Sequence, residues 1–111
     1  MESIKIGNKT FELVANGYQL QQDGGRIVFR PGEATFEEAE AVVSAATSIM
    51  LLDDAGEPLA SRRDLVYAGR MTRQSDYVIG TEKEESGADE DGNPIYIYKD
   101  VTGTVMIAEF R

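Results

Sequence analysis

The strongest candidate for chemistry in this 111-residue chain is an acidic stretch near its end. Asp89, Asp91, Asn93 and Asp100 stand at positions 1, 3, 5 and 12 of a calcium-binding loop. Such a loop also needs glycine at position 6 and helices on both sides, but here Pro94 takes position 6 and the flanking residues alternate as strands do. We therefore interpret the stretch as a solvated hairpin tip. A small ligand- or calcium-binding module that uses residues 89–100 stays open as the alternative function.

The side chains most used in catalysis and metal binding are absent, because the chain has no cysteine and no histidine. Carboxylate-only or Ser/Lys chemistry would be left for an enzyme. The 20 Asp and Glu residues could supply an acid–base pair, but most lie in runs such as 82–85 that are typical of exposed faces. Gly24-Gly25-Arg26 lacks the spacing of a phosphate-binding loop and precedes a strand. We predict no enzyme, with no catalytic residues, no cofactor and no metal.

Charge and hydropathy exclude two further classes of partner. The formal net charge of −9 repels a phosphate backbone, so we expect no nucleic-acid partner. No segment approaches the roughly 20 apolar residues that cross a membrane, so we expect no membrane partner. Residues 1–10 have neither the basic start nor the apolar run of a signal peptide.

The pattern of apolar residues predicts a single α+β domain over residues 1–111, with an antiparallel sheet packed against one α-helix. The sheet should combine an N-terminal meander with C-terminal hairpins. Period-2 apolar positions between Gly- and Asn-containing turns predict four meander strands, at about 3–6, 10–15, 18–22 and 26–30. Asn16-Gly17 is typical of a two-residue hairpin turn and should join the second and third of these strands.

A helix should begin after Thr35, because Thr35 and Glu38 have the spacing of a capping box. Apolar residues at i, i+3, i+7 and i+10 give it one buried face, formed by Phe36, Ala39, Val43 and Ala46. A short apolar run at 48–52 should then form a buried central strand.

The rest of the chain predicts strands joined by two related turns. Residues 53–58 and 89–94 share the pattern D-[DE]-x-G-x-P, which is typical of a hairpin turn with glycine in the left-handed conformation. Residues 59–72 should form a strand pair with a bulge. Strands at 77–83 and 95–98 should form a long hairpin around an acidic tip, and a final strand at 101–110 should be broken at Gly103.

Two features could contact another protein. Residues 60–75 hold four arginines against one aspartate, net +3, and residues 81–92 hold six acidic residues against one lysine, net −5. These segments could be neighbours within one fold, or could dock identical subunits in a ring or stack. Tyr96 and Tyr98 share one strand face, and they form an exposed contact patch if the opposite face, with Ile95 and Ile97, lines the core. The candidates for protein contact are therefore Arg62, Arg63, Arg70, Arg73, Tyr96 and Tyr98.

A short meander is followed by a helix opening T-F-E-E-A-E, a strand I-M-L-L-D-D-A-G-E-P, then Y-A-G-R-M and a tyrosine-rich hairpin. This order resembles the small accessory proteins encoded in tail modules of phages and prophages of Gram-positive bacteria. The resemblance covers residues 10–80 and leaves out the acidic loop at 82–94. It implies a non-enzymatic structural or assembly protein with protein partners. It also implies a protein made in the bacterial cytoplasm that could be carried into the virion.

Overall fold

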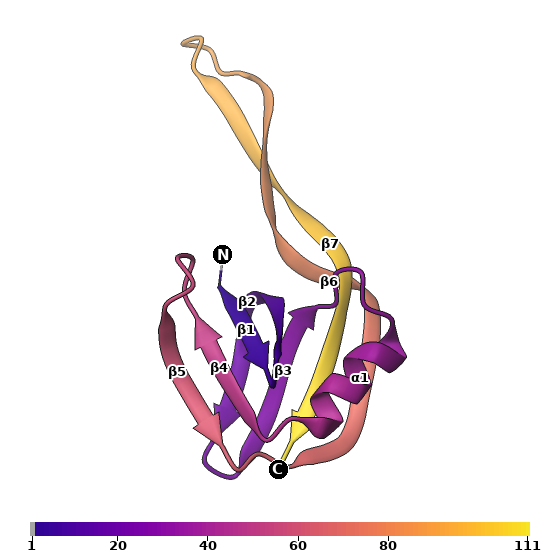
Figure 1. Ribbon diagram of the computed structural model, residues 1–111. Coiled ribbons are helices and arrows are strands. Elements are labelled where there is room, and N and C mark those ends of the chain that lie inside the picture. The colour runs from indigo at the N-terminus through magenta and orange to yellow at the C-terminus, as the bar shows by residue number, and fades with distance from the viewer. Residues whose placement is uncertain (1) are drawn as a thin grey trace.

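In the part of the chain that the computed structural model describes, residues 2–111, one seven-stranded antiparallel sheet is accompanied by one α-helix (Figure 1). The elements in chain order are β1 (Ser3–Ile6), β2 (Lys9–Gln21), β3 (Gly24–Arg30), α1 (Phe36–Ala45), β4 (Ser48–Leu52), β5 (Pro58–Arg63), β6 (Tyr67–Ala88) and β7 (Pro94–Phe110). Their spatial order is β5-β4-β1-β2-β3-β7-β6. The observed architecture agrees with the predicted α+β class and with a sheet packed against one helix.

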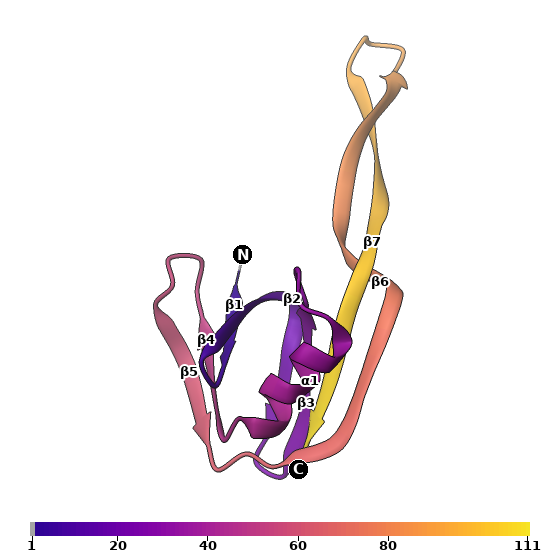
Figure 2. The same ribbon diagram turned by 45° about the vertical axis from the view of Figure 1, so that its right-hand side comes forward.

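The sheet is strongly curved, as its two edge strands show. β5 and β6 lie at opposite edges, yet only residues 64–66 join them. Six flat strand spacings would separate the edges by about 29 Å, whereas the four steps from Arg63 to Tyr67 can span at most about 14 Å. The sheet therefore curls, so the end of β5 and the start of β6 come close together at the end of the molecule where the C-terminus lies, which we call the base (Figures 1 and 2).

Backbone groups from distant segments close the base. The guanidinium group of Arg62 donates hydrogen bonds to the carbonyl oxygens of Gln21 and Gln22, in the turn between β2 and β3. The backbone N–H of Arg111 donates to the carbonyl oxygen of Val66 at 2.9 Å. The β2–β3 turn, the β5–β6 connection and the last residues of the chain are therefore neighbours.

The main core lies between α1 and the concave face of the sheet. The Thr35 hydroxyl accepts a hydrogen bond from the backbone N–H of Glu38 at 3.1 Å, which confirms the predicted N-cap. Three of the four predicted helix-face residues, Ala39, Val43 and Ala46, are buried, and the fourth is partly buried. They pack against alternating strand residues: Ile4, Ile6, Phe11, Leu13, Ile27, Phe29, Ile49, Met71, Met106, Ala108 and Phe110.

A smaller cluster covers the opposite face of the sheet. Its buried members are Val14, Val28 and Val105, one each from β2, β3 and β7. Tyr77 and Ile79 of β6, together with a neighbouring isoleucine of β7, pack against them and are partly buried. This cluster fixes the stretch of β6 that precedes the projecting hairpin described below.

Asn16-Gly17 does not form the predicted hairpin. Asn16 has a positive φ of 59°, but β2 continues through it. Between Leu13 and Tyr18 the register advances five residues on β2 and two on β3, so the extra residues form a bulge. A Cβ on Gly17 would lie 2.4 Å from the carbonyl oxygen of Val28, so glycine here permits close strand approach. The predicted strands 10–15 and 18–22 are therefore one bent strand, and the chain reverses after it.

Other predicted strands are confirmed or corrected. The run at 48–52 forms β4, which lies between β1 and β5. The strand is not buried as predicted, because only Ile49 of its five residues is buried and β4 lies next to the edge strand. Residues 59–72 do contain two strands, β5 and the start of β6, but these lie at opposite edges of the sheet and do not pair with each other. Gly103 does not break β7, which runs unbroken from Pro94 to Phe110; a Cβ on this glycine would lie only 3.0 Å from Ile79 Cδ1.

Candidate protein-contact site

A two-stranded arm, residues 80–102, projects from the end of the body that lies opposite the base (Figures 1 and 2). β3 pairs with β7 from Phe110 back to Met106, and in the described chain β6 and β7 then continue as a ribbon of two strands. Every one of the 23 residues in this arm is exposed. The arm makes the molecule 59 Å long, against 27 and 25 Å in the other directions. The long hairpin was predicted, but its projection from the body was not.

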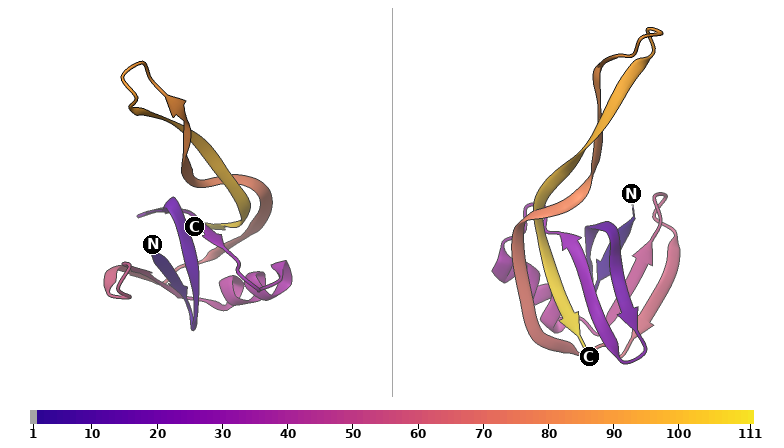
Figure 3. Two further views of the ribbon diagram at one scale, coloured as in Figure 1. Left: turned by 90° about the horizontal axis from the view of Figure 1, so that it is seen from above. Right: turned by 180° about the vertical axis from the view of Figure 1, so that it is seen from behind.

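Bulges in β6 give the arm its direction and twist. The register shifts at four places, between Tyr67 and Met71, between Gln74 and Tyr77, after Val78, and near the tip. At each place β6 has more residues than β7 between the flanking pairs. A bulge bends its strand and increases the local twist, so the ribbon leaves the line of the sheet and coils as it rises (Figure 3).

One face of the arm, which we call the aliphatic face, carries Ile95, Ile97 and Val101 of β7 together with Lys99. The three aliphatic residues are exposed, Ile95 to 45%. Gly87 lies opposite Ile95 and Gly80 lies opposite Val101, so no side chain on β6 shields these two residues. The aliphatic face is thus open to a partner.

The other face of the arm carries Tyr96 and Tyr98. Both are exposed, Tyr98 to 69%. The ammonium group of Lys83 lies 3.8 Å from the ring centroid of Tyr96, a cation–π contact within the arm. An exposed tyrosine patch was predicted on the condition that Ile95 and Ile97 line the core. That condition is wrong, because neither isoleucine lines the core. Both faces are exposed, since no body lies behind the arm.

The arm is strongly acidic. Residues 80–102 hold seven Asp and Glu against two Lys, a net charge of −5. Lys99 Nζ lies 2.6 Å from Glu84 Oε2, with the two side chains 60% and 52% exposed. An exposed pair of this kind contributes little to stability. The excess of carboxylates gives the arm a negative field that would favour a basic partner.

The acidic tip is built as a turn. Asp89 Oδ1 accepts hydrogen bonds from the backbone N–H groups of Asp91 and Asn93, each at 2.9 Å. Asp53 does the same in the turn between β4 and β5, again at 2.9 Å, which explains why the two segments share one sequence pattern. Glycines in both turns have positive φ, 81° and 82°, as predicted.

The proposed calcium ligands do not come together. Asp100 pairs with Thr81 and lies six residues beyond Pro94 along β7, a distance of about 20 Å in a strand. It therefore cannot join Asp89 at the tip. Within residues 2–111, no group of three or more acidic side chains is placed to hold a metal ion.

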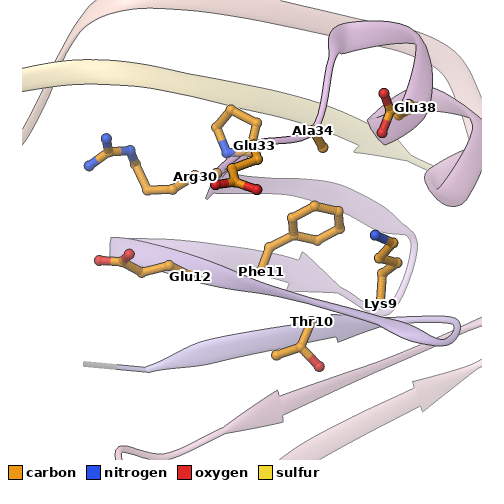
Figure 4. A pocket seen from close by; sticks show the side chains of 10 residues that line it. Lys9, Thr10, Phe11, Glu12, Arg30, Glu33, Ala34 and Glu38 are labelled. Atoms are coloured by element: carbon orange, nitrogen blue, oxygen red, sulfur yellow. The ribbon is translucent and has the colours of Figure 1, made fainter.

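A hollow of about 480 Å³ lies where β2 and β3 meet the start of α1 (Figure 4). Its charged side chains, among them Glu12, Arg30 and Glu38, stand around the ring of Phe11 and point in different directions. These residues come from β2, from β3, and from α1 and the connection into it, and Glu12 is the cross-strand partner of Arg30.

The predicted arginine candidates divide into two places. Arg62, Arg63 and Arg70 lie at the base, because β5 ends there and β6 starts there. Arg73 lies nearer the arm, where it lines a second hollow with Arg30 and the start of α1. The four arginines predicted as one segment therefore do not form one surface.

The base gains two arginines that sequence reasoning missed. Arg26 and Arg111 come from β3 and the C-terminal end, and the sheet register brings them beside the β5–β6 connection. Arg26 Nε donates to Gln19 Oε1 at 2.8 Å, and Arg70 Nε lies 3.2 Å from Glu109 Oε2. We call the five arginines the basal patch: Arg26, Arg62, Arg63, Arg70 and Arg111.

One tyrosine has a perturbed pKa, and its role is structural. The Tyr67 hydroxyl donates a hydrogen bond to Glu40 Oε2 at 3.0 Å and so links β6 to α1. Burial, together with this bond and the carboxylate charge, raises the pKa of Tyr67 to about 12.

Comparison with known proteins finds no matching family model, no matching curated protein and no matching solved structure. Across residues 2–111, no helix has both the length and the apolar character to cross a membrane. The arm and the basal patch are therefore the features from which a function can be inferred.

Proposed function

We propose that the protein is a non-enzymatic structural or assembly protein of a phage or prophage tail module, and that it acts through protein–protein contacts. The observation that carries the proposal is the arm, which adds no residue to either core cluster. It nevertheless exposes five large apolar side chains: Ile95, Tyr96, Ile97, Tyr98 and Val101.

Physical chemistry supports a partner for this arm. A two-stranded ribbon by itself is at best marginally stable in water. Burying one large aliphatic side chain contributes roughly 1.5–3 kcal/mol, so a protein that covers both faces of the arm would gain a substantial free energy. The cost of keeping these side chains in water is easiest to understand if the arm is an interaction surface.

The tail-module part of the proposal has separate support. It rests on the resemblance of residues 10–80, and on a chain with no histidine and no cysteine. Genes for tail or endolysin proteins beside the coding sequence would favour this assignment. A position within a metabolic operon would contradict it.

The direct experiment shortens the arm in the genome that encodes it. Residues 82–88 and 94–99 are deleted, so the native tip turn follows Thr81 directly, and the particles are examined by electron microscopy. We expect absent or malformed tails, although the shortened protein is still present at the normal level. Leu59→Ser, an exposed change outside the arm, is the matched control and should give normal particles. Normal tails with the shortened arm would refute the proposal.

A further inference from the structure

We propose that the arm of one copy docks on the base of a second copy of the same chain. The inference rests on the proposed function, because it names the partner of the same arm. It is carried by the distribution of charge, by the apolar groups at both ends, and by the shape of the molecule.

Charge separates along the long axis. The arm has a net charge of −5, and the base holds the five arginines of the basal patch against Asp23, Asp64 and Glu109, net +2. The remaining residues hold ten acidic side chains against four basic ones, net −6. An acidic arm is therefore attracted to the base and repelled by the rest of the body and by another arm.

The base also offers groups that match the arm chemically. A hollow of about 550 Å³ is lined by Arg26 and Arg70, by Glu109, and by Ala68, with the buried Phe110 at its floor. Each guanidinium uses its Nε in a contact with Gln19 or Glu109, and its other N–H donors can bind a carboxylate in bidentate fashion. Val66, whose carbonyl oxygen accepts the hydrogen bond from Arg111, is 51% exposed and adds an apolar group to the base. Such a surface can take an aliphatic or aromatic side chain with a carboxylate next to it.

Shape determines the kind of assembly. The arm and the base lie at opposite ends of a 59 Å molecule (Figure 1), so the two surfaces of one copy cannot meet each other. Each copy would use its arm on one neighbour and its base on another. Contacts of this head-to-tail kind close into a ring or continue as a stack, depending on the rotation between copies.

The test uses two variants of the full chain. Ile97→Ser with Tyr98→Ser removes the arm contacts, and Arg63→Glu with Arg111→Glu reverses charge at the base; all four residues are exposed. Sedimentation velocity is measured up to about 1 mM protein, the range of weak contacts. We expect the unaltered protein to associate beyond a dimer, and to do so less as salt rises. Each variant alone should associate at least tenfold more weakly.

An equimolar mixture of the two variants decides the geometry. Each retains one intact surface, so the mixture should form a dimer and stop there. Lys9→Glu with Arg73→Glu makes the same change of charge on exposed residues outside the basal patch, and it should leave association closer to that of the unaltered protein. Circular dichroism melting checks that every variant is folded.

Three outcomes would overturn the inference. The first is an unaltered protein that stays monomeric at every salt concentration. In that case the proposed function could still hold, with a different protein as the partner of the arm. The second is a base variant that associates normally while the arm variant does not, which indicates arm–arm contact. The third is a mixture of variants that forms no dimer. Failure of the proposed function is recognised separately, from the gene neighbourhood and from normal particles with a shortened arm.

Discussion

Shortening the arm should leave the stability of the body almost unchanged. The deletion of residues 82–88 and 94–99 joins Thr81 to the native tip turn and the turn to Asp100. Thr81 and Asp100 are cross-strand partners, as Ala88 and Pro94 are at the native turn. Pro94 and Asp100 are six residues apart, an even number, so the turn meets β7 in the same orientation of its backbone groups.

The expected change in the free energy of unfolding is the sum of small terms. The deletion removes the Lys99–Glu84 ion pair, which as an exposed pair contributes about 0–1 kcal/mol. It also removes the Lys83–Tyr96 contact, about 0.5–1 kcal/mol at an exposed site. The arm closes a loop between its two strands, and halving the length of this loop lowers the entropic cost of closing it. This change adds about 0.6 kcal/mol to the free energy of unfolding. No buried side chain is lost, so the net change should stay within about 1.5 kcal/mol.

Urea unfolding followed by circular dichroism measures this change, at a protein concentration low enough that association does not add stability. The slope of the transition should also be preserved, because the surface buried on folding is nearly the same. Ile27→Ala, a change at a fully buried residue, is the contrasting control and should cost about 2–5 kcal/mol. A loss of more than about 2 kcal/mol on shortening the arm would refute the separation of arm and core.

Three further predictions concern the body. Thr35→Ala should lower the free energy of unfolding by about 1 kcal/mol and Thr35→Ser by much less, measured by urea unfolding, since the hydroxyl caps α1; equal losses would contradict the cap. Gly25→Ala should cost more than about 2 kcal/mol in the same assay, because a Cβ would lie 2.0 Å from the Gln19 carbonyl oxygen at a φ of 148°; a neutral result would rule out this close approach. The raised pKa of Tyr67 means that its contribution to stability is complete below pH 10 and is lost as the pH rises towards 12. Tyr67→Phe should remove that part of the pH dependence in thermal melts, and an unchanged profile would exclude the Tyr67 hydroxyl as its source.

Features set by a few adjacent residues could be predicted from the sequence. The cap at Thr35 depends on one hydroxyl and a backbone N–H three residues later. The turns at Gly56 and Gly92 depend on one aspartate and one glycine within five residues. These caps and turns form through hydrogen bonds between residues a few positions apart. They can therefore be predicted without knowing which strands pair.

Features set by distant strands could not be predicted in this way. A positive φ at Asn16 suits a hairpin and a bulge equally, and the pairing of both halves of β2 with β3 decides between them. Alternation at Ile95 and Ile97 indicates a strand but not whether another layer covers its face. The basal patch combines residues from both edges of the sheet with Arg26, so it exists only because the sheet curls.

The extra residues of β6 have a consequence for how this molecule could diverge. Every bulge adds residues to β6 and none to β7. The direction in which the arm points therefore depends on the number of extra residues in β6 more than on which amino acids they are. Ser86 is the extra residue between the pairs Glu85–Tyr96 and Gly87–Ile95. Removing it would give regular strand pairing near the tip and change the direction in which the last turn points. Related chains could therefore reach differently placed neighbours by single insertions or deletions, while the helix and the concave core stay as they are.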